Sequence, residues 1–186
     1  SADFDITNLT YGAGVGSFRK RFEEMLPELR SRFFQQLVGN LSKNATATSA
    51  LATDTKGYPA SLSFSAHVAD FAVIQGDALT LTIPDFSSSL FSVGGPLRKS
   101  PLAVPGKAEE VDTYEIILPE GYTAVEHLPE SLLLANPMRP DEAWLTHDVS
   151  QRVVDGRLRV TVRRRARREH ATQLTADYFP FLRDWN

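Results

Sequence analysis

Residues 153–164 read VVDGRLRVTVRR, a stretch in which a turn signal is followed at once by a strand pattern. Asp155 and Gly156 form one of the dipeptides that favour a two-residue β-hairpin turn. After the turn every second residue is apolar, which is the period of a strand with one buried face. We therefore expect an antiparallel hairpin formed by residues 142–153 and 156–169.

The same period of two recurs through much of the chain before this hairpin. Turn-forming residues such as glycine and proline separate the periodic segments. This alternation is typical of antiparallel sheets, and it predicts a mainly β fold, an antiparallel β-sandwich. The other expected strands are 3–12, 45–54, 60–74, 77–84, 112–119 and 123–129.

One amphipathic helix is expected near the N-terminus, over about residues 17–38. Its apolar residues recur at steps of three and four and so form a single stripe. Ser17 is a suitable N-cap, Gly39 and Asn40 are a suitable stop, and Pro27 should kink the helix or restart it. The stripe consists of Phe18, Phe22, Met25, Leu26, Leu29, Phe33 and Leu37.

Residues 84–110 are a long Pro/Ser-rich stretch without a clear period. Such a segment is either a linker between two domains or a crossover between two sheets of one domain. We favour the crossover, because each group of strands alone is small for a stable core, and we expect one domain over 1–186. The closing sequence DYFPFLRDW, residues 177–185, has helical spacing and predicts a short C-terminal helical segment.

The composition narrows the chemistry that the chain can perform. Of its 186 residues 42% are hydrophobic and 23% charged, as in ordinary globular proteins, and none is cysteine. Disulfides, thiolate metal sites and cysteine nucleophiles are therefore excluded. No apolar run approaches the roughly 18 residues that a membrane helix needs. The opening residues SADFDITNLTYG contain no pattern of a targeting signal.

Charge is distributed unevenly along the chain. Residues 152–170 hold eight arginines and two carboxylates, a formal +6, so the other residues carry −9 to give the net charge of −3. We expect Arg157, Arg159 and Arg163 to project from one face of their strand and to pair with carboxylates, because planar guanidinium groups suit such contacts. Nucleic acid is not expected as a partner, because the chain as a whole is acidic and has no stacking aromatic between 145 and 177.

Other patterns could carry chemistry, but each has a simpler structural interpretation. The glycine-rich turn at 11–22 is typical of phosphate binding, yet it lacks the P-loop lysine and the downstream acidic residue. Thr146, His147 and Asp148 could supply part of a triad, but no serine lies in a nucleophile-elbow context. A glycosidase pair of carboxylates stays open, because separation in space defines it. The histidines lack metal-ligand spacing, and we expect no catalytic residue, metal or cofactor. The candidates considered are His67, His127, His147, His170, Glu109, Glu110, Asp112, Asp141 and Glu142.

Four segments of the second half together resemble a known family. In chain order they are PLRKSPLAVPG, YEIILPEGYTAVEHLPE, DGRLRVTVRR and YFPFLRDW. This order resembles the C-terminal β domain, of unknown function, of bacterial transglutaminase-like proteins, and the resemblance is best over residues 96–186. It contains no catalytic motif. Its features are Arg98 and Pro101, a strand ending at Leu118 and Pro119, Gly121 and Tyr122, the corner at Leu128 and Pro129, and the closing Tyr178 and Phe181.

The resemblance implies an antiparallel β-sandwich in an exported, periplasmic or cell-surface protein, next to a transglutaminase-like core. Such a core needs a cysteine nucleophile, which this chain lacks. We therefore expect a noncatalytic accessory module that packs against or positions a neighbouring domain of the same polypeptide. Its expected interaction surface contains Arg98, Arg157, Arg159 and Arg163.

Two other hypotheses stay open from the sequence. One is a peptide- or glycan-binding β-sandwich module that uses the glycine-rich turn and residues 84–110. The other is an enzyme of an unrecognised type.

Overall fold

The computed structural model describes residues 1–84, 99–104, 106–128 and 130–175. Strands account for 51% and helices for 16% of the structure. Every strand pair in these residues is antiparallel. The expected mainly β class with antiparallel sheets is therefore confirmed.

The chain divides into two compact units, Ser1–Ser88 and Ser89–Asn186, where the sequence predicted a single domain over 1–186. Each unit contains a buried hydrophobic cluster formed by its own residues. Each strand group thus has a core of its own, and the two units are described one at a time.

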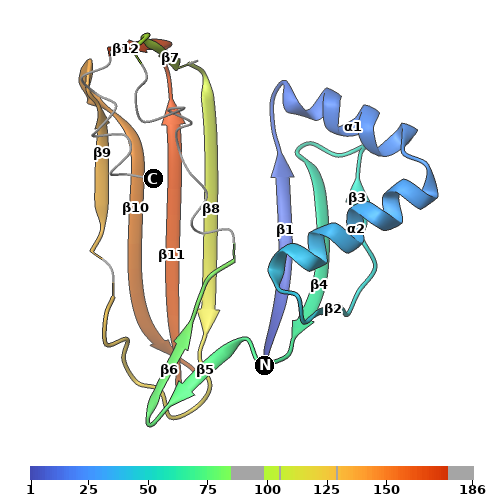
Figure 1. Cartoon of the computed structure of the whole chain (residues 1–186), viewed down its shortest axis with the longest axis vertical. Coiled ribbons are helices and arrows are strands. Elements are labelled where there is room, and N and C mark those ends of the chain that lie inside the picture. Colours follow the sequence, from blue (N-terminus) through green and yellow to red (C-terminus); the bar gives the residue numbers. More distant parts are fainter. Residues whose placement is uncertain (85–98, 105, 129, 176–186) are drawn as a thin grey trace. The chain divides into compact units, whose positions relative to one another are not determined.

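The first unit contains a four-stranded antiparallel sheet (Figure 1). Its strands are β1 (Ala2–Thr10), β2 (Ala45–Ala47), β3 (Ala52–Asp54) and β4 (Ala60–Val68). β4 is paired along its whole length with β1, and its other edge pairs with the two short strands. Every second residue of β4 is buried, so one face of the sheet is apolar and the other polar.

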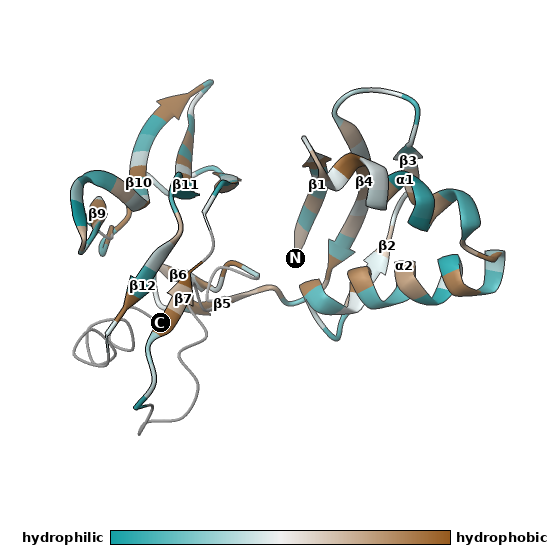
Figure 2. Cartoon of the chain, turned by 90° about the horizontal axis from the view of Figure 1, so that it is seen from above, coloured by the Kyte–Doolittle hydropathy of each residue, from teal (hydrophilic) through white to brown (hydrophobic). Residues whose placement is uncertain are grey.

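Two helices, α1 (Gly14–Glu24) and α2 (Pro27–Leu41), lie on one side of this sheet (Figure 2). Pro27 stands in the first turn of α2, where its missing N–H costs nothing, so it restarts the helix as expected. The expected cap at Ser17 is wrong, because the backbone is already helical at Ala13 and no side chain caps α1. The expected stop at Gly39 and Asn40 is also wrong, because α2 continues to Leu41. Neither helix is long and apolar enough to cross a membrane, among the residues that the structure describes.

The apolar face of this sheet and the inner faces of the helices form the first core. Phe22, Val38 and Phe64 are buried there. Phe34 meets Phe64 edge to face, with ring centroids 5.5 Å apart and an interplanar angle of 81°. Leu26, which the predicted stripe also contained, is 61% exposed. It lies outside both helices, at the break before Pro27.

A separate hairpin follows β4 in the chain. It consists of β5 (Ala72–Gln75) and β6 (Ala78–Leu81). The predicted turn at residues 75–77 joins the two strands, and Gly76 adopts a φ of +59° in it.

The second unit contains a four-stranded antiparallel sheet in the order β8, β11, β10, β9 (Figure 1). The strands are β8 (Ala108–Ile117), β9 (Leu132–Asn136), β10 (Arg139–Val154) and β11 (Arg157–Arg168). β10 and β11 form the predicted hairpin, in which Val154 lies opposite Arg157. The two residues between them, Asp155 and Gly156, have φ values of 52° and 74°, as a type I′ turn requires.

A small sheet of β7 (Leu102–Val104) and β12 (Thr172–Leu174) completes the second unit. Val104 and Leu174 are buried against Leu134 of β9 and Trp144 of β10. This second core is therefore built between the small sheet and one end of the large one.

Some expected segments differ from the structure. Residues 123–128, expected as part of a strand, contain none, whereas β7 and the start of β8 lie within the expected crossover 84–110. Strands of three residues, such as β7, are too short to leave a period, and they depend on pairing with distant segments. Residues 85–98 of the crossover and the expected helical segment at 177–185 lie outside the described residues.

Candidate functional site

The four-stranded sheet of the second unit has one apolar and one charged face. Leu158, Val160 and Val162 of β11 are between 2% and 6% exposed. Side chains alternate along a strand, so the residues between them project from the opposite face. We call that side the arginine face. It carries Arg152 of β10 and Arg157, Arg159, Arg163, Arg165 and Arg167 of β11.

Two arginines of this face are joined to carboxylates of β8. Arg159 Nη1 lies 2.8 Å from Glu115 Oε1, and Arg165 Nε lies 2.7 Å from Glu109 Oε1. Both pairs are diagonal in the sheet, since Glu115 stands directly opposite Thr161. The pairing of Arg159 with a carboxylate agrees with the sequence-based expectation. Exposed pairs of this kind contribute about 0–1 kcal/mol each.

Arg164 belongs to the other face and is more enclosed. Its Nε and Nη2 donate to Asp112 Oδ2 at 3.1 and 2.7 Å, and its side chain is only 11% exposed. Asp112 stands directly opposite Arg164 on β8. This ion pair therefore lies on the same side of the sheet as the apolar residues and does not belong to the arginine face.

At the end near the β10–β11 turn, the arginine face holds more positive charge than the sheet neutralises. We call Arg152, Arg157, Arg159 and Arg163 the hairpin cluster. Arg152 stands directly opposite Arg159, an arrangement of like charges that destabilises a sheet. With Glu115 and Asp148 as the carboxylates on the same part of this face, the local formal charge is +2.

Three members of the hairpin cluster are exposed, namely Arg152, Arg157 and Arg163. No ion pair joins any of them to another residue in the part of the chain that the structure describes. Asp148 lies opposite Arg163 in the register without forming such a pair. The expected carboxylate pairing is thus seen for Arg159 but, among the described residues, not for Arg157 or Arg163. The three arginines do share one face, as the sequence predicted, and Arg152 joins them. The other predicted surface residue, Arg98, lies outside the described residues.

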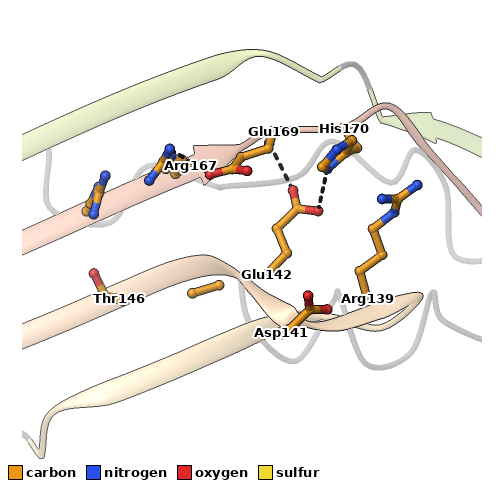
Figure 3. A pocket seen from close by; sticks show the side chains of 9 residues that line it. Arg139, Asp141, Glu142, Thr146, Arg167, Glu169 and His170 are labelled. Atoms are coloured by element: carbon orange, nitrogen blue, oxygen red, sulfur yellow. Dashed lines mark hydrogen bonds and ion pairs between the residues drawn. The ribbon is translucent and has the colours of Figure 1, made fainter.

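A pocket of about 340 Å³ lies at the opposite end of the arginine face (Figure 3). Three arginines, three carboxylates and one histidine line it, so its charges are nearly balanced. Arg167 is held by Glu169, with Nη2 2.6 Å from Oε1. The lining residues are Arg139, Asp141, Glu142, Ala143, Thr146, Arg165, Arg167, Glu169 and His170.

Glu142 is the best-anchored side chain of this pocket. Its Oε1 accepts a hydrogen bond from the backbone N–H of Glu169 at 2.9 Å. Its Oε2 accepts one from Asn136 Nδ2 at 3.1 Å and lies 3.2 Å from His170 Nδ1. The backbone hydrogen bond from Glu169, followed by the bonds from His170 and Asn136, lowers the pKa of the Glu142 carboxyl from 4.5 to about 2.

Asn136 extends this network into the core. It is fully buried, accepts a hydrogen bond from the N–H of Met138 at 2.9 Å and donates to Thr172 Oγ1 at 3.3 Å. The network therefore ties the β9–β10 turn to β12. Its geometry is that of a structural clamp, since the described contacts satisfy both oxygens of Glu142.

The sequence did not predict this clamp. It offered Glu142 only as one of several candidate carboxylates, with no partner named, and the side chain is only 9% exposed. Its partners Glu169 and His170 lie 27 and 28 residues further along the chain. Only the antiparallel return of β11 brings them close, so no local pattern could signal the contact.

The remaining candidates for catalysis and metal binding do not converge. Among the described residues, no group of three or more His, Asp or Glu side chains could hold a metal ion. His67 pairs with Asp3 at 2.7 Å in the other unit. Thr146 and Asp148 project from the arginine face and His147 from the opposite one, so these three neighbours cannot act as one group.

Comparison of the chain with family models, with curated proteins and with solved structures finds no match in any of the three.

Proposed function

We propose that the chain is a noncatalytic accessory module that docks, through the hairpin cluster, on a carboxylate-bearing surface of a neighbouring domain in the same polypeptide. The resemblance in the second half suggests a transglutaminase-like core of an exported protein as that neighbour. The proposal rests above all on the excess of arginine at one end of the sheet, where Arg152 and Arg159 stand opposite each other.

The chemistry of the cluster favours a protein surface as its partner. Arginine is enriched in protein interfaces, and its planar fork binds carboxylates with two hydrogen bonds. Ile117, directly opposite Arg159, is 48% exposed, and Val154, directly opposite Arg157, is half-buried on the same face. These side chains offer the apolar contact that an interface needs between its charged groups.

Several of the residues that could carry catalysis are already engaged within the fold. Glu142 is bound by three donors, and His67 is paired with Asp3. Glu109 and Asp112, which were open as glycosidase carboxylates, are held by arginines. These contacts support a noncatalytic role for the described residues.

An association experiment in trans tests the proposal. The chain is titrated with the separately produced neighbouring domain at about 150 mM salt, where exposed charges are screened beyond roughly 8 Å. We expect a complex that weakens as salt rises, and at least about tenfold weaker binding by the triple variant Arg157→Gln, Arg159→Gln and Arg163→Gln.

A control variant, Lys20→Gln with Arg32→Gln and Lys43→Gln, changes the net charge equally but at exposed positions of the first unit. It should bind like the wild type. Equal affinity of both triple variants would contradict docking through the cluster. A duplex DNA that competes for the same arginines at this salt concentration would replace the proposed partner by nucleic acid.

A further inference from the structure

Two exposed tyrosine rings stand together at one end of the sheet in the first unit. Tyr11 follows β1 and is 58% exposed, and Tyr58 precedes β4 and is 69% exposed. Their ring centroids are 6.0 Å apart at an interplanar angle of 89°. Leu9, 51% exposed, lies two residues before Tyr11. Exposed apolar groups that gather in this way are typical of a binding site.

The loop that carries Tyr58 is held by five hydrogen bonds. Tyr58 Oη accepts one from Gly12 N at 3.2 Å. Asp54 Oδ1 accepts from the N–H groups of residues 56–57 at 2.9 and 2.8 Å, and Arg19 Nη2 donates to the carbonyls of the same residues at 3.3 and 3.1 Å. A ring fixed before binding loses little conformational entropy when a ligand stacks on it.

The sheet face on the side away from the helices is lined by polar groups. On β4, hydroxyl and imidazole groups alternate with buried residues, and on β1 exposed polar groups alternate with half-buried residues up to Thr7. Asp5 Oδ1 accepts a hydrogen bond from Ser65 Oγ at 2.6 Å. From these two strands the face includes Asp3, Asp5, Thr7 and Leu9 of β1 and Ser61, Ser63, Ser65 and His67 of β4. Leu9 thus lies on the polar face, two residues before Tyr11 and directly opposite Ser61 of β4.

We propose that this end of the first unit binds a carbohydrate: a neutral sugar ring stacks on Tyr11 and Tyr58, and neighbouring sugar units hydrogen-bond along the polar face. One face of a pyranose ring presents C–H groups that pack on an aromatic ring. Its hydroxyl groups match the hydroxyl and carboxylate side chains of β1 and β4. This site lies on other residues than the hairpin cluster, so the two proposals stand or fall separately.

A sugar fits this surface better than a proline-rich peptide does. Such peptides lie in grooves between aromatic rings and place apolar side chains in pockets. Here the two rings are perpendicular and more than half exposed, and Leu9 is the single apolar side chain that β1 and β4 place on the polar face. Two exposed aromatic rings near a face of hydroxyl side chains suit a ligand that carries many hydroxyl groups, such as a sugar.

Calorimetric titration of the whole chain tests the assignment. The probes are cellohexaose and chitohexaose as neutral oligosaccharides and decaproline as a peptide. We expect at least one oligosaccharide to bind. Tyr11→Ala and Tyr58→Ala should each weaken it at least about tenfold, because each removes a stacking ring. Tyr11→Phe keeps the ring and removes none of the five hydrogen bonds of the loop, so it should stay close to the wild-type affinity.

Leu29→Ala is the control, since Leu29 is 51% exposed on α2, away from the tyrosines in the chain. It should leave binding unchanged. Circular dichroism and thermal melting check the fold of each variant. If an alanine variant unfolds, saturation-transfer NMR on the wild-type chain decides, because bound sugar must then show contact with tyrosine ring protons. No binding of either oligosaccharide, binding unaffected by both alanine variants, or decaproline bound in their place would each overturn the proposal.

Discussion

Glu142 accepts three hydrogen bonds at the end of the second sheet, and the pKa of its carboxyl is lowered from 4.5 to about 2. Because the pKa of this carboxyl is lower in the folded protein than in the unfolded chain, the ionised carboxylate stabilises the fold above about pH 4.5. That contribution is lost as the pH falls from about 4.5 towards 2. At the scale of single residues, this side chain therefore gives the clearest pH dependence in the described part of the chain.

Glu142→Gln should lower the melting temperature most at pH 5 and above. The gap between wild type and variant should narrow as the pH is lowered to 2, because the wild-type carboxylate is then protonated. Thermal denaturation followed by circular dichroism across this range measures the gap. Glu120→Gln, an exposed acid, serves as the control. A gap that does not change with pH would show that Glu142 is not charged in its network.

Gly106 depends on a close backbone approach. A Cβ at this position would lie 2.5 Å from Ala171 N and 2.5 Å from the carbonyl carbon of His170, and neither backbone atom can move aside easily. Gly106→Ala should therefore lower the free energy of unfolding by about 1–3 kcal/mol or more. At Gly16 in α1 a Cβ meets nothing within 4 Å. Gly16→Ala should raise the same quantity by up to about 1 kcal/mol. Urea denaturation of both variants measures the contrast, and equal effects would contradict the close approach.

At the scale of elements, the β10–β11 hairpin contains the like-charged pair of Arg152 and Arg159. Arg152→Glu replaces this repulsion with an attractive cross-strand pair. It should raise the free energy of unfolding by about 0.2–1 kcal/mol, and less in high salt. Urea denaturation at low and high salt provides the measurement, with Arg32→Glu on α2 as the matched control. Destabilisation by Arg152→Glu would mean that Arg152 already has an anionic partner inside the fold.

The elements with strong local signals could be predicted from the sequence. Asp155 and Gly156 place the hairpin turn correctly, and the alternation in residues 60–68 gives β4. The restart at Pro27 follows from the missing N–H of proline. β7 and β12 could not be predicted, because three residues show no period and their pairing joins segments far apart in the chain. The start of α1 was misplaced, because the helix already begins at Gly14, within the glycine-rich segment that was expected to be a turn.

The candidate site was predictable only in part, because contacts between segments far apart in the chain also determine it. The alternation of β11 sets which arginines share a face, so Arg157, Arg159 and Arg163 were found together. Arg152 joins them through the register of β10, which a pattern along one strand does not specify. The tyrosine pair needs the end of β1 to meet the loop before β4, a contact across 46 residues between Gly12 and Tyr58.

At the scale of the whole molecule, the two hydrophobic clusters draw on different units. Leu174 is fully buried in the cluster of the second unit. Leu174→Ala should lower the stability of that unit by about 2–5 kcal/mol. Hydrogen exchange should then accelerate in β9 and β10 but not in β4, because the buried partners of Leu174 lie in its own unit. Equal acceleration in β4 would show that the chain unfolds as one cooperative body.

Chemical footprinting of arginine tests most directly the proposed docking of the hairpin cluster on a neighbouring domain. Phenylglyoxal modification is followed residue by residue by mass spectrometry, in this chain alone and in the longer polypeptide that contains the neighbour. Arg157 and Arg163 are exposed here and should react readily in the chain alone, and several-fold more slowly in the longer polypeptide. Arg32 on α2 should react equally in both. Equal reactivity of Arg157 and Arg163 in the two forms would contradict the account.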